Sequence, residues 1–291
     1  MSGFNWILLW PLFLAACAPG LTRQDAETAE ALARPAGLLP QVRQGGQFAL
    51  TTRERFDRAG DDLTIYIEGD GVAWASRTLP SNDPTPYLPV ALALAALDPS
   101  SNVAWIARPC QYLPVVDTRT CPVYFWTHGR LAPEVVRSMD AVVTQVKAAA
   151  RAQRVHLVGY SGGGGLAVLV AAGRGDVGSI RTVAANLDID AFTRIHQVSP
   201  MTGSLNPAGV AHRIETIPQL HLVGASDTIA PAQIARAYLA AMTRQDCSKL
   251  VMVPGATHQD GWAAAWPPFA RTLPVCPDGV RSTLPAAAPL R

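Results

Sequence analysis

Residues 154–172 read RVHLVGYSGGGGLAVLVAA, and the fold that we predict is built outward from them. Residues 154–158 are a short apolar run, typical of a strand buried on both faces. Residues 162–172 are rich in Gly and Ala and predict a helix. Between them lies G-x-S-x-G, centred on Ser161, and a strand, a tight turn and a helix in that order raise a serine Oγ above the sheet edge. Ser161 is therefore our candidate nucleophile.

Strands and helices alternate on both sides of this stretch. The expected strands are residues 48–52, 63–68, 102–107, 154–158, 180–185, 219–223 and 249–253. The expected helices are residues 86–97, 135–149, 162–172, 231–242 and 262–272. This alternation is typical of an α/β fold with a mostly parallel central sheet and helices on both of its faces.

Four segments do not follow the alternation. Residues 108–130 and 187–218 are expected to be loop insertions over the C-terminal edge of the sheet. Residues 17–46 mix polar residues with Ala, Pro and Gly and lack a long apolar period, which predicts a tether. Residues 274–291 form a Pro- and Ala-rich tail, and the folded domain is expected to span residues 47–273.

The N-terminus is typical of an exported protein. Residues 1–16 carry no charge, and their apolar core is shorter than the roughly 20 residues that span a bilayer, so they predict a signal peptide. Leu14-Ala15-Ala16-Cys17 then resembles the lipobox of bacterial lipoproteins. That resemblance implies acylation of Cys17 and a lipid anchor, on the outer membrane facing the periplasm. An uncleaved anchor or a buried apolar segment is the alternative.

The cysteine count is odd, since Cys17 is accompanied by Cys110, Cys121, Cys247 and Cys276. In an oxidising compartment an even remainder of four predicts two disulfides. Four cysteines allow three connectivities, and only the preference for short loops favours Cys110 with Cys121 and Cys247 with Cys276. No pair has the C-x₂₋₄-C spacing of a zinc site, so we expect no metal.

A nucleophilic serine needs a general base, and the base needs an acid to orient it. Asp227 lies just past an expected strand, and His258 lies in the loop after the next one. These two residues are the candidate acid and base. Asp188 and Asp190, which follow the strand expected at 180–185, are alternative acids.

The chain order Ser161, Asp227, His258 resembles that of the α/β-hydrolase superfamily, over residues 48–273. Four further motifs resemble a group of poorly characterised proteobacterial lipoprotein hydrolases. They are YIEGDG at 66–71, RPCQY at 108–112, VGYSGGG at 158–164 and SLNP at 204–207. The resemblance implies the α/β-hydrolase fold and hydrolase chemistry.

An oxyanion hole needs two backbone N–H donors. Gly162, directly after the candidate nucleophile, is the first. By analogy with the His-Gly sequence of the superfamily, which is Glu-Gly here, the second is Asp70, with Gly71 as the alternative. The Asp70 carboxylate would oppose an oxyanion unless it turns away or is paired. Arg108 is a candidate partner for it or for Glu68, and a solvated turn carboxylate is the alternative.

These residues predict a serine hydrolase, most simply a carboxylic ester hydrolase that forms an acyl-enzyme and uses no cofactor. The expected substrate is a small-molecule or lipid ester, and the membrane is reached through the N-terminal lipid. With 24 Lys and Arg against 22 Asp and Glu, the net charge of +2 does not favour nucleic acid. An acyltransferase or peptidase with the same triad, or a non-catalytic envelope binding lipoprotein, is the alternative. The sequence predicts no oligomeric state.

Overall fold

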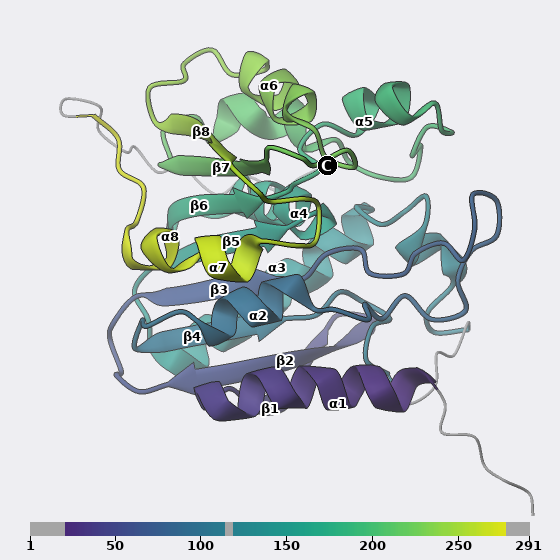
Figure 1. Cartoon of the computed structure of the whole chain (residues 1–291). Coiled ribbons are helices and arrows are strands. Elements are labelled where there is room, and N and C mark those ends of the chain that lie inside the picture. The colour runs from purple at the N-terminus through teal and green to yellow at the C-terminus, as the bar shows by residue number, and fades with distance from the viewer. Residues whose placement is uncertain (1–20, 114–118, 278–291) are drawn as a thin grey trace, which may run out of the picture.

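The computed structural model describes residues 21–113 and 119–277, which form an eight-stranded sheet covered by helices (Figure 1). The strands are β1 (Leu39–Gly45), β2 (Phe48–Phe56), β3 (Leu63–Ile67), β4 (Asn102–Ile106), β5 (Val155–Tyr160), β6 (Val177–Val183), β7 (Gln219–Gly224) and β8 (Ser248–Val253). Their order is β1-β2-β4-β3-β5-β6-β7-β8. The β1–β2 and β2–β4 pairs are antiparallel, and all other neighbours are parallel. The predicted mostly parallel sheet is confirmed.

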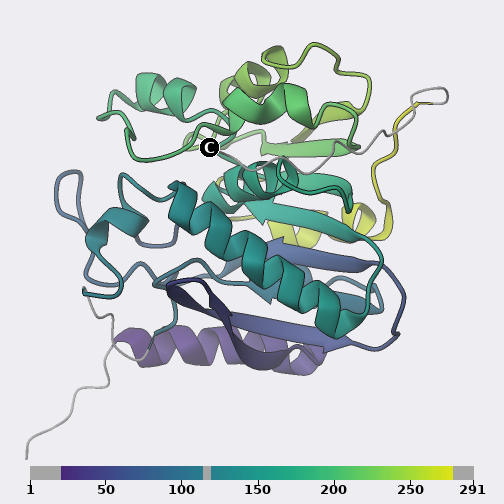
Figure 2. The ribbon, with the colours of Figure 1, turned by 180° about the vertical axis from the view of Figure 1, so that it is seen from behind.

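Helices cover both faces of the sheet. They are α1 (Leu21–Ala33), α2 (Val90–Ala96), α3 (Pro133–Ala150), α4 (Gly162–Ala171), α5 (Ile189–His196), α6 (Ala232–Ala240), α7 (Trp262–Ala265) and α8 (Pro267–Arg271), with 3₁₀ turns at Arg34–Ala36, Val123–Trp126 and Pro207–Arg213. In Figure 1 α1, α2, α7 and α8 lie in front of the sheet. Figure 2 shows α3 and α4 on the opposite face. Each face therefore has its own apolar core.

The central strands are buried on both faces, as their apolar sequences predict. Every residue of β3, β4 and β5 is buried. Because β3, β4, β5, β6, β7 and β8 run parallel, their carboxyl ends meet at one edge of the sheet, and the loops that follow them gather there. In an open α/β sheet that edge is where ligands bind.

The predicted tether is wrong over residues 21–45. These residues form α1 and β1, and all seven residues of β1 pair with β2. Ala29 and Ala33 of α1 are fully buried in the core beside α2. The sequence did not predict this helix because its buried face consists mainly of small alanines, and β1 is an edge strand whose side chains are largely exposed.

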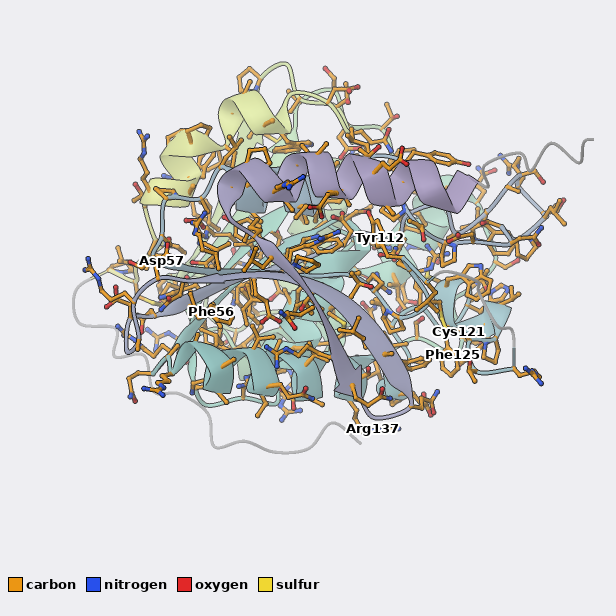
Figure 3. All side chains as sticks on the ribbon, turned by 90° about the horizontal axis from the view of Figure 1, so that it is seen from below. Phe56, Asp57, Tyr112, Cys121, Phe125 and Arg137 are labelled. Atoms are coloured by element: carbon orange, nitrogen blue, oxygen red, sulfur yellow. A yellow bond between two sulfur atoms is a disulfide. The ribbon has the colours of Figure 1, made fainter. Side chains whose placement is uncertain are left out.

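The two predicted insertions contain local structure. Residues 187–218 hold α5 and the 3₁₀ turn at Pro207–Arg213, and residues 108–130 hold the turn at Val123–Trp126. Figure 3 shows Tyr112, Cys121 and Phe125 of the insertion at residues 108–130 toward one end of the sheet, and Phe56 and Asp57 toward the other.

Both sequence-local disulfides are present in the structure. Cys110 is bonded to Cys121 and Cys247 to Cys276, with Cα–Cα distances of 5.8 and 4.4 Å. The second bond attaches the segment after α8 to the start of β8. The expected signal peptide, Cys17 and residues 278–291 of the tail lie outside the described residues. Within the ranges that the structure describes, no helix combines the length and apolarity that a membrane span needs.

A charge on the buried face of α1 tests whether this helix belongs to the folded domain. We expect Ala29→Arg to lower the free energy of unfolding by about 3 kcal/mol or more, because it buries an unpaired charge. Ala26→Arg, on the exposed face of the same helix, is the matched control and should change it by less than about 0.5 kcal/mol. Urea unfolding measures both, and equal effects would contradict the packing of α1.

Candidate active site

Ser161 occupies a sharp turn between β5 and α4. Its φ of 51° and ψ of −123° are a conformation that non-glycine residues rarely adopt. The turn is held by the backbone: the Ser161 N–H donates to Val183 O at 3.0 Å, and Ser161 O accepts from the N–H groups of Gly164 and Asn186 at 3.0 and 3.1 Å. These hydrogen bonds therefore hold Ser161 in a strained conformation at the carboxyl end of β5.

Two glycines of the motif allow the turn to pack so closely. A Cβ on Gly159 would lie 2.3 Å from Gly163 O, and a Cβ on Gly163 would lie 2.3 Å from Ile67 O at the end of β3. Both contacts are with backbone atoms, which cannot move aside cheaply. A side chain at either position would therefore push α4 away from the sheet.

Ser161, His258 and Asp227 form a hydrogen-bonded chain. His258 lies in the loop after β8, with its Nε2 3.1 Å from Ser161 Oγ. Its Nδ1 is 3.0 Å from Asp227 Oδ2, in the loop after β7. The three candidate residues, distant in sequence, thus meet in the order that a nucleophile, a base and an acid require.

The Asp227 carboxylate is fixed before it meets His258. Its side chain is 0% exposed, and Oδ1 accepts from the N–H groups of Ile229 and Ala230, both at 2.8 Å. Burial raises the pKa of Asp227, but the hydrogen bonds from His258 and from these two N–H groups outweigh it, so the pKa lies below its ordinary value. The side chain is therefore an anion that orients the imidazole.

Two aromatic residues hold the backbone of His258, and the sequence did not predict this role for them. Tyr160, the variable residue before Ser161 in the motif, donates from its hydroxyl to His258 O at 3.1 Å. Trp262 Nε1 donates to the same oxygen at 3.0 Å and to Thr257 O at 3.0 Å. The rings of Tyr160 and His258 lie 5.5 Å apart. The sequence could have indicated this role only through the position of two hydrogen-bond donors, the Tyr160 hydroxyl within the motif and the Trp262 indole at the start of the helix after His258.

The alternative acids are engaged elsewhere. Asp188 caps α5 by accepting from the N–H groups of Asp190 and Ala191 at 3.0 and 3.1 Å. Asn206 Nδ2 donates to Asp188 Oδ1 and to Asp190 Oδ2, at 3.0 and 3.1 Å. Neither carboxylate is hydrogen-bonded to His258 in the described part of the chain, where Asp227 has that position.

The candidate oxyanion donors lie where β3 and β5 end side by side. A Cβ on Gly69 would be 3.3 Å from Ser161 Cβ, and one on Gly162 would be 2.1 Å from Asp70 Oδ1. Among the described residues, the N–H groups of Asp70 and Gly162 have no acceptor. Gly71 N–H also has none, but this residue packs against Pro84, whose O would be 2.0 Å from a Cβ there. The structure thus brings Asp70 and Gly162 together.

The two carboxylates of this loop have different partners. Glu68 is fully buried and accepts from the N–H groups of Gly69, Ala91 and Leu92 and from Trp105 Nε1, at 2.9 to 3.3 Å. Burial raises its pKa, although these donors oppose the shift. Arg108, which we expected beside either carboxylate, is not its partner.

Arg108 instead pairs with Asp70, together with Arg130, which the sequence did not indicate. Their Nη1 atoms lie 2.7 Å from Oδ1 and 2.9 Å from Oδ2 of Asp70. Burial raises the pKa of Asp70, but the charges of Arg130 and Arg108 outweigh it and lower the pKa below its ordinary value. The carboxylate beside the candidate oxyanion hole is therefore paired.

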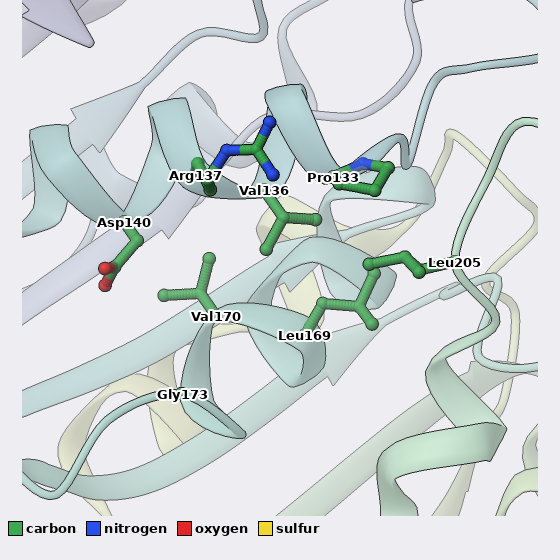
Figure 4. A pocket seen from close by; sticks show the side chains of 8 residues that line it. All are labelled: Pro133, Val136, Arg137, Asp140, Leu169, Val170, Gly173 and Leu205. Carbon is green, nitrogen blue, oxygen red and sulfur yellow. The ribbon is translucent and has the colours of Figure 1, made fainter. Parts of the chain in front are cut away.

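A separate cavity of about 170 Å³ lies between α3 and α4 (Figure 4). Its lining residues are Pro133, Val136, Arg137, Asp140, Leu169, Val170, Gly173 and Leu205. None of them belongs to the site around Ser161. Within residues 21–113 and 119–277, no three His, Cys, Asp or Glu side chains gather in a group that could hold a metal ion.

Known proteins resemble this chain in structure. No protein-family model and no curated protein matches the sequence. The esterase Pf2001 of Pyrococcus furiosus covers 81% of this chain and 91% of its own, with a TM-score of 0.57 and 11% identity. Est1E of Butyrivibrio proteoclasticus covers 80% and 96%, with a TM-score of 0.55 and 15% identity. An α/β serine hydrolase homologue of Coxiella burnetii covers 79% and 94%, with a TM-score of 0.54 and 16% identity.

The chain has the α/β-hydrolase fold. The fold expected from the sequence is thereby confirmed. At these identities the likeness concerns the fold alone.

Acid titration tests the environment of Asp227. Because its folded pKa lies below the unfolded value of about 3.9, the stability that its contacts supply is complete above about pH 4 and is lost as the pH falls through the folded pKa. We expect the free energy of unfolding to fall less steeply in this range for Asp227→Asn than for the wild type. Ser226→Ala, which removes an exposed side chain without a titratable group beside Asp227, is the control with a wild-type slope. Parallel curves for all three proteins would contradict the assignment.

Proposed function

We propose that this protein is a serine hydrolase that cleaves carboxylic esters, with Ser161 as nucleophile, His258 as general base and Asp227 as the acid that orients it. The observation that carries the proposal is the chain of two hydrogen bonds, 3.1 Å from His258 Nε2 to Ser161 Oγ and 3.0 Å from His258 Nδ1 to Asp227. It lies at a strained turn at which the serine is half-buried, and this is the arrangement that acyl transfer to serine needs.

The first half of the reaction follows from these contacts. Ser161 Oγ attacks the ester carbonyl carbon while its proton passes to His258 Nε2. The ionised Asp227 accepts the hydrogen bond from Nδ1–H and stabilises the imidazolium. The N–H groups of Gly162 and Asp70 donate to the carbonyl oxygen as it becomes an oxyanion.

The second half releases the products. His258 gives its proton to the departing alkoxide, which leaves an acyl group on Ser161. Water then attacks the acyl carbonyl carbon, His258 takes the proton from that water, and Ser161 Oγ leaves with the proton returned from His258. The carboxylic acid is released, and the free enzyme is restored.

The choice of esters rests on chemistry and on the structural neighbours. Of the three similar structures described above, Pf2001 is described as an esterase and the Coxiella burnetii protein as a serine hydrolase homologue. A serine with a histidine base and an ionised aspartate is sufficient to cleave an activated ester, because the alcohol of such an ester leaves readily. We therefore place carboxylic esters ahead of amides as substrates of this chain.

Reaction with a fluorophosphonate probe tests the nucleophile. We expect the wild type to be labelled on Ser161 and to hydrolyse p-nitrophenyl butyrate, and Ser161→Ala to lose both activities. Ser226→Ala, which removes an exposed serine beside Asp227, should be labelled like the wild type. Unchanged labelling of Ser161→Ala would refute the nucleophile, and a wild type that neither reacts nor hydrolyses esters would favour a non-catalytic binding protein.

We further propose that the enzyme is tethered to the bacterial envelope through lipid on Cys17. The lipobox-like Leu14-Ala15-Ala16-Cys17 and the two disulfides, which suit an oxidising compartment, support this. Acylation with two or more chains is sufficient for stable anchoring.

Labelling with radioactive palmitate in a bacterial host tests the anchor. We expect the label and the membrane association to be lost in Cys17→Ser and retained in Ala18→Ser, because only the first removes the acylated thiol. Incorporation of palmitate into Cys17→Ser would exclude this attachment site.

A further inference from the structure

We propose that Arg108 and Arg130 are positioning residues of this site, which compensate the charge of Asp70 and thereby keep its N–H usable as an oxyanion donor. The inference rests on the proposed function, because it assigns a role in the same reaction. It is supported by the position of the Asp70 carboxylate beside Gly162, by its ion pairs with both arginines, and by the hydrogen bonds that hold the arginines.

The Asp70 carboxylate lies against the first oxyanion donor. A Cβ on Gly162 would be only 2.1 Å from Asp70 Oδ1 and 2.7 Å from Oδ2, so the carboxylate lies directly beside this glycine. The N–H of Gly162 and that of Asp70 itself are the two candidate donors. An uncompensated negative charge here would oppose the negative charge that develops on the substrate oxygen. The reaction would then be slowed by the residue that supplies one of its donors.

Each carboxylate oxygen of Asp70 has its own guanidinium. Arg108 Nη1 donates to Oδ1 at 2.7 Å, and Arg130 Nη1 donates to Oδ2 at 2.9 Å. The side chains of Arg108, Arg130 and Asp70 are only 5, 12 and 15% exposed, so water screens their charges weakly. The two contacts also fix the carboxylate in one orientation, and with it the peptide that precedes the side chain.

Arg108 and Arg130 are the first and last residues of the insertion at 108–130, and other residues of that insertion hold both of them. Arg130 Nε donates to Thr127 O at 2.8 Å, and Arg108 Nη2 donates to Arg130 O. The backbone N–H of Arg108 donates to Gln111 Oε1 at 3.1 Å, and Gln111 Nε2 donates to Gly69 O at 3.0 Å. The insertion therefore holds both the side chain of Asp70 and the peptide before it.

A disulfide closes this insertion between the two arginines. Cys110 and Cys121 are bonded to each other and almost fully buried. The ends of the segment, which carry Arg108 and Arg130, both reach Asp70. A loop whose two ends meet at one carboxylate is suited to set the position of that carboxylate.

Charge compensation can be separated from mere cross-linking by a double-mutant cycle on the full-length protein. The variants are Arg130→Gln, Asp70→Asn and the two combined, assayed with the uncharged ester p-nitrophenyl butyrate. We expect Arg130→Gln to lower kcat about tenfold or more, with KM changed less than about twofold, because the oxyanion exists only after attack. The combined variant should recover most of that loss: Arg130→Gln leaves Asp70 with Arg108 alone, whereas removing the carboxylate as well restores the net positive charge that the wild-type group carries.

Two further variants control for folding and for general effects of arginine loss. Arg130→Lys keeps the charge and should retain more activity than Arg130→Gln. Arg137→Gln removes an exposed arginine that pairs with Glu134 on the surface of α3, and it should behave as wild type. Thermal unfolding of every variant shows whether a loss of kcat follows a loss of structure.

The outcomes separate this inference from the proposed function. Wild-type kcat in Arg130→Gln, or equal losses in Arg130→Gln and the combined variant, would overturn the positioning role while Ser161 labelling of the wild type still supports a serine hydrolase. A wild type that neither reacts with a fluorophosphonate nor hydrolyses the ester would overturn both.

Discussion

The close backbone contact between the start of α4 and the end of β3 is the constraint on which the site depends. Gly163 lies so near Ile67 O that a single added carbon would come within 2.3 Å of it. This contact allows the chain to turn at Ser161 directly over the sheet edge, in a strained conformation that its backbone hydrogen bonds maintain. It also brings the loop after β3 against Ser161 and Gly162. The turn and the candidate oxyanion hole are therefore products of the same packing.

Parallel strands supply the remaining parts of the site. The loops after β7 and β8 emerge at the edge where β5 ends, so Asp227 and His258 reach Ser161 from neighbouring strands. Backbone N–H groups fix Asp227, and Tyr160 and Trp262 fix the carbonyl of His258. Asp227 and His258 of the proposed triad are thus each held by further contacts, which is what preorganised catalysis would require.

The close packing of the loop after β3 against α4 also places a charged side chain beside the candidate oxyanion hole. It brings the Asp70 carboxylate beside Gly162, where a negative charge is unfavourable for acyl transfer. Arg108 and Arg130, at the two ends of the insertion at 108–130, both form ion pairs with this carboxylate. The role that we propose for its arginines follows from these contacts, although the insertion lies outside the regular alternation of strands and helices.

Much of this could be predicted from the sequence, because the signals were local. The glycine spacing around Ser161 and the position of Asp227 and His258 after strands predicted which residues meet. Arg108 was a candidate partner of Asp70 because it ends the neighbouring strand. Arg130 could not be found this way, since it is 22 residues further along the chain than Arg108 and meets Asp70 through tertiary contacts.

The helix α1 and the strand β1 could not be predicted from the sequence either. The buried face of α1 is made mainly of small alanines, and β1 exposes most of its residues. Neither therefore has the strong apolar period by which helices and strands are recognised, and packing alone makes them part of the domain.

A crystal structure of the protein after reaction with a phosphonate ester tests the central claim most directly. The account predicts a covalent bond from Ser161 Oγ to phosphorus, with the phosphonyl oxygen within hydrogen-bond distance of the Gly162 and Asp70 N–H groups and Arg108 and Arg130 still on the Asp70 carboxylate. Phosphorus on another residue, or a phosphonyl oxygen directed away from both N–H groups, would contradict it.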